Sequence, residues 1–201
     1  FKALNQEFSQ LAIEPVMQEL KNKYRDYPQV SAYLDTVHSD VMDEAESLTQ
    51  IKDDSAIPVN LKERVREFPQ YSVNLLVDNQ DLPAAPIVYE DSPGFSNLIG
   101  RVEHVSQMGT LVTDFTLIKP GALHQANGGY LVLEADKVLT SPYAWVALKR
   151  ALKAQEVRIQ SLEQIFSFVS TVQLQPEPLP LNVKVVLTGD RLIYYILQQY
   201  D

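Results

Sequence analysis

The chain has 201 residues and a formal net charge of −9 at pH 7, and its 45% hydrophobic residues are enough for a real core. The absence of cysteine excludes disulfides, cysteine-based zinc sites and thiol nucleophiles, and three scattered histidines (His38, His104 and His124) lack metal-ligand spacing. The chain has no run of about 18 apolar residues that would span a membrane, and it does not begin with a secretory signal, so we expect a cytoplasmic protein with no membrane partner. The lack of a basic stripe argues against nucleic acid as a partner.

The first 60 residues are predicted to form helices. Their surface is expected to be acidic, since this stretch has 11 acidic and 5 basic residues. Apolar residues from Val30 to Leu48 recur at three- and four-residue steps, which places them on one helical face. Two shorter stretches of this kind precede them, with Pro15 acceptable at a kink or a fresh helix start. We therefore expect a helical hairpin or small bundle over residues 1–55 that serves as a spacer or docking arm.

Residues 51–60 follow neither the helical nor the strand periodicity, and we expect a linker there. The pattern then predicts an α/β domain over residues 56–201. A helix is predicted from about Tyr143 to Ala154, and Gln175–Pro180, with three prolines, is predicted to be an extended lead-in. The last two predicted strands are near-continuous apolar runs, as expected of strands buried in a parallel sheet. The predicted strands are Tyr71–Val77, Ile87–Tyr89, Tyr130–Glu134 and Val183–Thr188.

The most informative stretch runs from Pro120 to Asp136 and predicts a short helix, a Gly-Gly turn and a hydrophobic strand that ends in acids. The carboxyl ends of parallel strands open onto the ligand crevice of such a sheet. Glu134 at this place can hold a magnesium ion beside bound phosphates, directly or through water. Asp136, two residues on, is the candidate that orients an attacking water for γ-phosphate hydrolysis.

The second buried strand ends in Thr188, Gly189 and Asp190, and its end is expected to lie beside the end of the first. A polar group there can hydrogen-bond the γ-phosphate or the water and report the nucleotide state. Asp190 can equally cap the helix that follows it, and both roles stay open.

Several runs of the sequence resemble the AAA+ segment of Lon-related ATP-dependent proteases of the LonB type. The resemblance spans roughly residues 70–201, and the helical front, with LKNKYRDYPQVSAYLD, is similar to the end of that family's helical insertion. The runs that carry it are NLIGRVEH, GTLVTDFTLIKPGALHQANGGYLVLEAD, WVALKRAL and VKVVLTGDRLIYYIL.

The resemblance implies a partial AAA+ domain, a P-loop NTPase-like three-layer fold, without the phosphate-binding loop. It further implies a parent that uses ATP and Mg²⁺, forms a homo-oligomeric ring, expected to be a hexamer, and threads protein substrates toward a Ser-Lys proteolytic site. Because the chain starts at Phe1 and carries neither a Walker A motif nor that dyad, we expect it to be an inactive piece of a longer protein.

Position by position, the resemblance places the Walker B motif at the end of the first buried strand. The usual Asp-Glu pair falls on Glu134 and Ala135, with Asp136 one place later. Glu134 is then the magnesium candidate, and Asp190 stands where many AAA+ motors have the asparagine of sensor 1.

The segment before the Walker B strand stands where related motors insert a substrate-gripping loop into the central pore. Leu111, Val112 and Phe115 are the candidate grips, with Phe115 preferred and a core role open for the other two. Arg101 and Glu103 could contact nucleotide or a neighbouring subunit, or simply pair with each other.

Two other classes of protein fit the same residues. One is an AAA+ motor of the transcriptional-activator or chelatase type, which would share the fold without the protease. The other is a scaffold whose degenerate Walker B motif marks a dead ATPase kept for assembly. A downstream Ser-Lys domain and an upstream phosphate-binding loop would discriminate among these classes.

Overall fold

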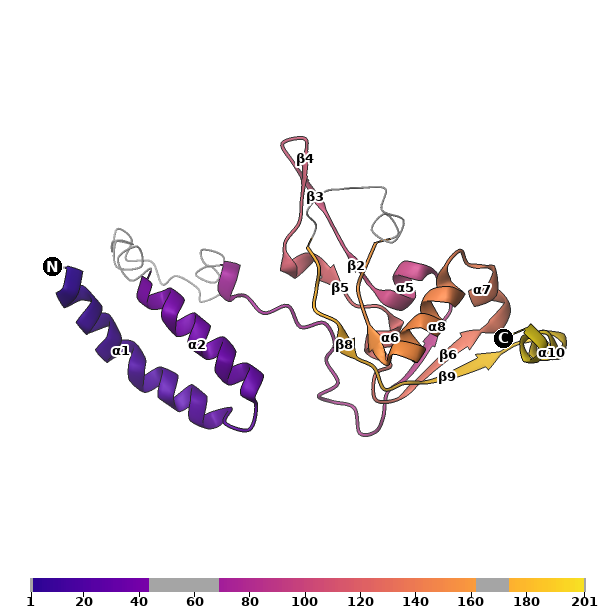
Figure 1. Cartoon of the computed structure of the whole chain (residues 1–201), viewed down its shortest axis with the longest axis horizontal. Coiled ribbons are helices and arrows are strands. Elements are labelled where there is room, and N and C mark those ends of the chain that lie inside the picture. The colour runs from indigo at the N-terminus through magenta and orange to yellow at the C-terminus, as the bar shows by residue number, and fades with distance from the viewer. Residues whose placement is uncertain (1, 44–68, 162–173, 201) are drawn as a thin grey trace. The chain divides into compact units, whose positions relative to one another are not determined.

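The computed structural model describes residues 2–43, 69–161 and 174–200 (Figure 1). The chain divides into two compact units, residues 1–72 and 73–201. The linker predicted at residues 51–60 lies outside the described residues.

The first unit contains two paired helices, α1 (Lys2–Lys23) and α2 (Pro28–Asp43) (Figure 1). Leu34 of α2 is buried, as its place on the predicted apolar face requires, and Lys21 Nζ lies 2.5 Å from Asp35 Oδ1 across the pair. The helix α1 runs through Pro15 as one element. The predicted helical hairpin is thus confirmed, whereas the predicted extension of α2 to Leu48 lies outside the described residues.

The second unit is built on a three-stranded parallel sheet with the strand order β1-β6-β9. The three strands are Ile87–Glu90, Tyr130–Glu134 and Lys184–Thr188. The central strand β6 forms where it was predicted, because its backbone pairs with a strand on each side and its Leu131 and Leu133 are buried in the core. The predicted α/β class with a parallel sheet is confirmed.

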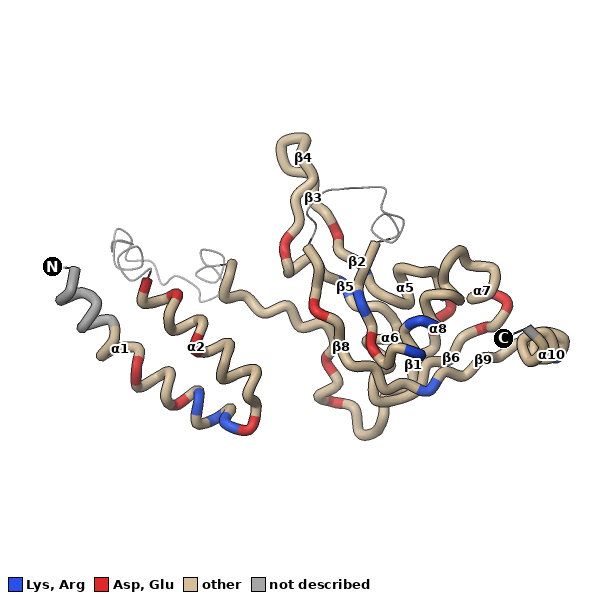
Figure 2. Tube along the Cα trace, in the orientation of Figure 1, with Lys and Arg blue, Asp and Glu red and all other residues tan. Residues whose placement is uncertain are grey.

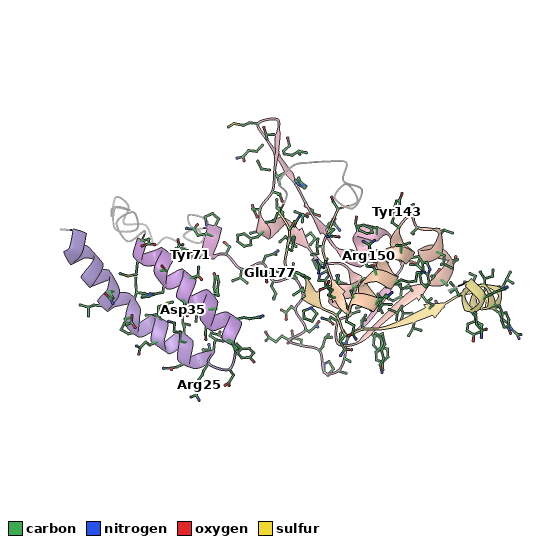
Figure 3. All side chains as sticks on the ribbon, in the orientation of Figure 1. Arg25, Asp35, Tyr71, Tyr143, Arg150 and Glu177 are labelled. Atoms are coloured by element: carbon green, nitrogen blue, oxygen red, sulfur yellow. The ribbon has the colours of Figure 1, made fainter. Side chains whose placement is uncertain are left out.

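The core against one face of the sheet is built by helices α5 (Phe95–Ile99), α6 (Ala122–Gln125), α7 (Ala135–Thr140) and α8 (Ala144–Ala154) of this unit. Leu131 and Leu133 of β6 are fully buried there, together with Leu148 of the helix predicted from Tyr143. Tyr143 has a left-handed backbone (φ 62°) directly before that helix, and its side chain is half exposed (Figure 3).

The opposite face of the sheet carries exposed apolar side chains. Ile87 is paired in register with Tyr130, and their side chains are 74% and 39% exposed. Tyr89 and Val186 on the flanking strands are also exposed, with Val132 of β6 between them in the register. This is the face that a third layer would cover in a three-layer domain.

None of the described helices of the chain is long and apolar enough to cross a membrane. Shorter elements complete the second unit. The hairpin β3–β4 projects from the rest of this unit (Figure 1). The remaining described elements of this unit are β2 (Arg101–Val102), β3 (Val105–Gln107), β4 (Thr110–Val112), η2 (Phe115–Leu117), β5 (Ile118–Lys119), β7 (Glu156–Val157), β8 (Leu179–Pro180) and α10 (Arg191–Tyr200), and η1 (Pro69–Tyr71) belongs to the first unit.

The strand predicted at Tyr71–Val77 is wrong, because η1 ends at Tyr71 and residues 72–77 join no sheet. Asn74 holds this segment through its side chain, whose Nδ2 donates to the carbonyls of Phe115 (2.8 Å) and Ile118 (3.1 Å). Apolar alternation alone therefore did not distinguish a ladder strand from an extended segment. The proline-rich stretch at Gln175–Pro180 contributes only the two-residue strand β8, which pairs with β7.

Candidate functional site

The acids singled out in the sequence lie at the carboxyl edge of the parallel sheet. Glu134 is the last residue of β6 and is in register with Thr188, the last residue of β9. The prediction that these two strand ends lie side by side is confirmed. Glu90 ends β1 at the same edge, in register with Leu133.

Both carboxylate oxygens of Glu134 are engaged. Tyr89 Oη donates a hydrogen bond to Oε1, and Lys137 Nζ lies 3.2 Å from Oε2. These two contacts, the tyrosine hydroxyl first, hold the pKa of Glu134 below its usual range, and the same hydrogen bond raises the pKa of Tyr89. Glu134 is therefore an ionised acceptor that is already satisfied by its own chain.

Lys137 ties this edge together from the first turns of α7. Its Nζ lies 2.5 Å from Asp91 Oδ1, just beyond the end of β1, in addition to its contact with Glu134. The hydrogen bond to Asp91, followed by that to Glu134, raises the pKa of Lys137 well above its ordinary value. The ammonium is thus held as a cation between two acids.

Asp136 differs from Glu134 in having a free carboxylate. It is exposed in the first turn of α7, where the helix dipole favours an acid, and no hydrogen bond or ion pair to its carboxylate occurs among the described residues. Its carboxylate is available to a ligand or to water.

Asp190 caps α10, because its Oδ1 accepts a hydrogen bond from the backbone N–H of Leu192 at 2.6 Å. This is the capping alternative that the sequence left open beside a sensor role. Thr188 Oγ1 donates to the carbonyl of Leu133 at 3.3 Å, which fastens the end of β9 to β6.

The residues at this edge do not fit a preformed magnesium site. The expected ligand Glu134 has its two oxygens bound to Tyr89 and Lys137. Within residues 2–43, 69–161 and 174–200, moreover, no three acidic, histidine or cysteine side chains are grouped as metal ligands. The predicted coordination of Mg²⁺ by Glu134 therefore requires that Lys137 or Tyr89 give way.

The candidate pore-loop residues separate on the β3–β4 hairpin. Leu111 and Val112 lie on β4, with side chains 70% and 40% exposed, whereas Phe115 begins η2 beyond the hairpin and is half-buried. Met108 at the turn is fully exposed, and no charged residue lies between Val105 and Val112 (Figure 2). The hairpin therefore presents an uncharged, partly apolar tip.

The hairpin turn itself was missed in the sequence. Met108 and Gly109 both have positive φ (49° and 81°), as a two-residue hairpin turn of the primed type requires. The signal available in the sequence was the pair Met108-Gly109 between two short stretches with β propensity, since glycine readily adopts a positive φ. Lys137 was missed as well, and its three-residue spacing from Glu134 was the signal there.

Arg101 and Glu103 pair with each other, since Arg101 Nη2 and Nε lie 2.7 and 3.0 Å from Glu103 Oε1. Both side chains are more than a third exposed. This agrees with the simple ion pair among the predicted alternatives, and a contact with nucleotide or a neighbouring subunit stays a prediction.

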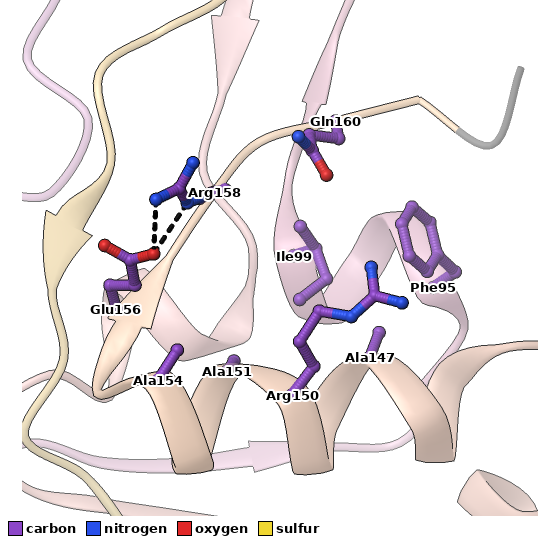
Figure 4. Close-up of a pocket in the computed structure, with 9 residues that line it drawn as sticks. All are labelled: Phe95, Ile99, Ala147, Arg150, Ala151, Ala154, Glu156, Arg158 and Gln160. Carbon is purple, nitrogen blue, oxygen red and sulfur yellow. Dashed lines mark hydrogen bonds and ion pairs between the residues drawn. The ribbon is translucent and has the colours of Figure 1, made fainter. Parts of the chain in front are cut away.

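A separate pocket lies between α5, α8 and β7, away from the acidic edge. Arg150 extends from α8 toward Ile99 and Phe95, while Arg158 is turned to Glu156, whose Oε1 lies 2.6 Å from its Nη2 (Figure 4). The pocket is floored by apolar side chains and contains none of the predicted site residues.

The family comparison matches most of the second unit. A family model described as "LonB-like, AAA domain" matches residues 83–201. The chain belongs to the LonB-like AAA domain family. A protein described as a Lon protease homolog of Escherichia coli (strain K12) is 34% identical over 83 residues, which are 39% of this chain and 12% of that protein. This LonB-like domain thus spans a small part of the length of that relative.

Two solved structures of NtrX from Brucella abortus are also similar to this chain. One, in complex with ADP, has a TM-score of 0.34 and 15% identity over 84% of this chain and 38% of its own. The other has a TM-score of 0.34 and 16% identity, with coverages of 84% and 40%. The assignment to the LonB-like family therefore rests on the sequence match.

Proposed function

We propose that this chain forms the Walker B and sensor side of the ATP-driven motor in a Lon-related protease. The observation that carries the proposal is the meeting of Glu134 and Thr188, with Asp136 and Asp190 directly behind them in the chain, at the carboxyl edge of a parallel sheet. Ligands of open α/β sheets bind at this edge. The LonB-like AAA family match over residues 83–201 supports ATP as that ligand.

Within this function Asp136 is the acid that orients the attacking water. Its carboxylate is exposed and free of partners among the described residues, as a group that must accept a hydrogen bond from water requires. Glu134 sets the charge of the edge and is held in place by Tyr89 and Lys137. Asp190 positions the start of α10 beside the site.

The β3–β4 hairpin is proposed to grip unfolded protein substrates. An uncharged tip with Met108 and Leu111 exposed can hold varied sequences through apolar contact, without a preference for one charge. Phe115 is proposed to support the base of the hairpin, since it is half-buried in η2.

The wider function belongs to the parent protein. We propose a cytoplasmic homo-oligomeric ring, a hexamer, in which ATP turnover with Mg²⁺ threads substrates to a Ser-Lys proteolytic site. The similarity to a Lon protease homolog supports this, and because the match spans 12% of that protein, the proteolytic step is assigned to the remainder of the parent.

The alternative of a catalytically inactive AAA scaffold is favoured by one observation. Ala135 occupies the place of the second Walker B acid, and the carboxylate of Glu134 is satisfied by its own chain. In a scaffold these contacts would stabilise the fold alone, and ATP turnover would not depend on Glu134 or Asp136.

The test is ATP-dependent casein breakdown by the full-length parent with Glu134→Gln, Asp136→Asn and, as a control, Glu177→Gln at an exposed position. We expect Asp136→Asn to lose at least about tenfold in turnover, because removal of one acid–base group typically costs about 10²–10⁴ in rate. Glu134→Gln should also lower turnover, because it removes the negative charge that Tyr89 and Lys137 hold at this edge. The control should match the wild type. Unchanged turnover in both site variants would support the scaffold instead.

A further inference from the structure

A lysine ammonium lies between two carboxylates at the carboxyl edge of the sheet. Lys137 Nζ is 2.5 Å from Asp91 Oδ1 and 3.2 Å from Glu134 Oε2. The acids come from two neighbouring strands, because Asp91 follows β1 and Glu134 ends β6. The ammonium therefore joins the two strand ends at the place where a divalent ion would have to lie to use both acids.

The contacts of Glu134 place Lys137 where a metal ion would approach the same carboxylate. A magnesium ion would have to approach one carboxylate oxygen to about 2.1 Å. Oε2 already pairs with Lys137, and Oε1 accepts the hydrogen bond of Tyr89. A divalent charge at Oε2 would stand next to the ammonium, and the repulsion between the two positive charges opposes metal binding.

We propose that Lys137 is the resident cation of this edge, occupying the position between Asp91 and Glu134 and so excluding a divalent metal ion from Glu134. Lys137 is thus a positioning residue that decides whether Glu134 can serve as a metal ligand. Its bearing on catalysis rests on the proposed function, whereas the exclusion itself rests only on the contacts of these three residues.

A purely structural tie between β1 and α7 would predict something different. Loss of the tie would lower stability and leave the affinity for divalent ions unchanged. Exclusion by charge instead predicts that the affinity rises when the ammonium is removed and stays low when a positive charge is kept. The decisive quantity is therefore metal affinity.

The test measures binding of Mn²⁺ to the full chain by the electron paramagnetic resonance signal of the free ion. The variants are Lys137→Met, Lys137→Arg, and Lys137→Met combined with Glu134→Gln, with Lys153→Met on the exposed side of α8 as the matched control. We expect Lys137→Met to bind Mn²⁺ at least about tenfold more tightly, since removing one adjacent positive charge is worth at least about one decade.

Lys137→Arg and Lys153→Met should bind Mn²⁺ as weakly as the wild type, and the gain should vanish in the double variant. An unchanged affinity in Lys137→Met would overturn the proposal. A gain that persists with Glu134→Gln, or one that Lys153→Met reproduces, would overturn it as well, because the ion would then bind elsewhere or respond to net charge.

A second measurement needs no change at Lys137. Mg²⁺ is titrated into the wild-type chain while the backbone amide resonances of Glu134 and Lys137 are recorded. We expect no saturable shift below about 1 mM, and a saturable shift at these amides would contradict exclusion. Both measurements omit ATP, so a failed exclusion is distinguishable from a failed motor function, which casein breakdown by the parent reports.

Discussion

The hydroxyl of Tyr89, on β1, donates a hydrogen bond to the carboxylate of Glu134 at the end of β6. The two residues are 45 positions apart, and the parallel pairing of β1 with β6 brings them together. The contact fixes one oxygen of the acid that the Walker B resemblance singles out.

Replacing Tyr89 with phenylalanine should raise the pKa of Glu134 toward its ordinary value. The tyrosine hydroxyl is the largest cause of the lowered pKa, because its hydrogen bond favours the charged carboxylate. Carboxyl carbon resonances followed over an acid titration measure this directly. Tyr130→Phe, on the same face of the sheet, is the control, and a Glu134 titration that Tyr89→Phe leaves unmoved would contradict the assignment.

The buried His124 should make the second unit sensitive to mild acid. Burial lowers its pKa from 6.5 to about 4, and its Nδ1 accepts from the backbone N–H of Gly121, which requires the neutral ring. Between these two values the unfolded chain binds a proton that the folded chain does not, so stability falls as pH falls from about 6.5 toward 4. The slope approaches about 1.4 kcal/mol per pH unit, up to roughly 3 kcal/mol in total.

Urea unfolding at pH values from 7 to 4.5 measures this dependence. His124→Gln should flatten it, whereas His104→Gln, at an exposed position, should keep the wild-type slope. Equal slopes in the wild type and His124→Gln would show that another group carries the acid sensitivity.

Asp190 should act through its capping oxygen. Asp190→Ala removes the acceptor for the Leu192 N–H and is expected to lower the free energy of unfolding by about 1 kcal/mol. Asp190→Asn keeps an acceptor oxygen and should cost only a few tenths. Thermal or urea unfolding compares the two, with Asp81→Ala in an exposed turn as the control. A similar loss in both Asp190 variants would speak for the negative charge over the cap.

The hairpin tip should affect substrate handling and leave stability unchanged. Met108→Ser and Leu111→Ser alter exposed side chains, so the free energy of unfolding should change by less than about 0.5 kcal/mol. In the full-length parent they should slow breakdown of folded substrates more than cleavage of short peptides. Thr110→Ser is the control between them, and equal effects on both kinds of substrate would count against a gripping role.

Phe115→Ala should behave differently from the tip variants. Phe115 is half-buried in η2, so removal of its aromatic ring is expected to lower stability in addition to any effect on substrates. An unfolding midpoint equal to that of the wild type would indicate that Phe115 has no structural role and can contact substrates as Met108 and Leu111 are proposed to do.

The sequence by itself determined the strands and helices that depend on local pattern. The apolar run Tyr130–Glu134 formed the central strand as predicted, and the amphipathic run after Tyr143 formed α8, because side chains that face a core leave a readable apolar pattern. The LonB-like family was also readable in the run from Pro120 to Asp136.

Only the tertiary structure decided the partners of the site residues. Tyr89 and Asp91 reach Glu134 and Lys137 through the register of β1 against β6, which no local pattern encodes. Met108 became the exposed tip because two successive residues with positive φ close the hairpin there. The sequence thus predicted which residues could carry charge at the carboxyl edge, and strand pairing decided that Lys137 contacts both Asp91 and Glu134.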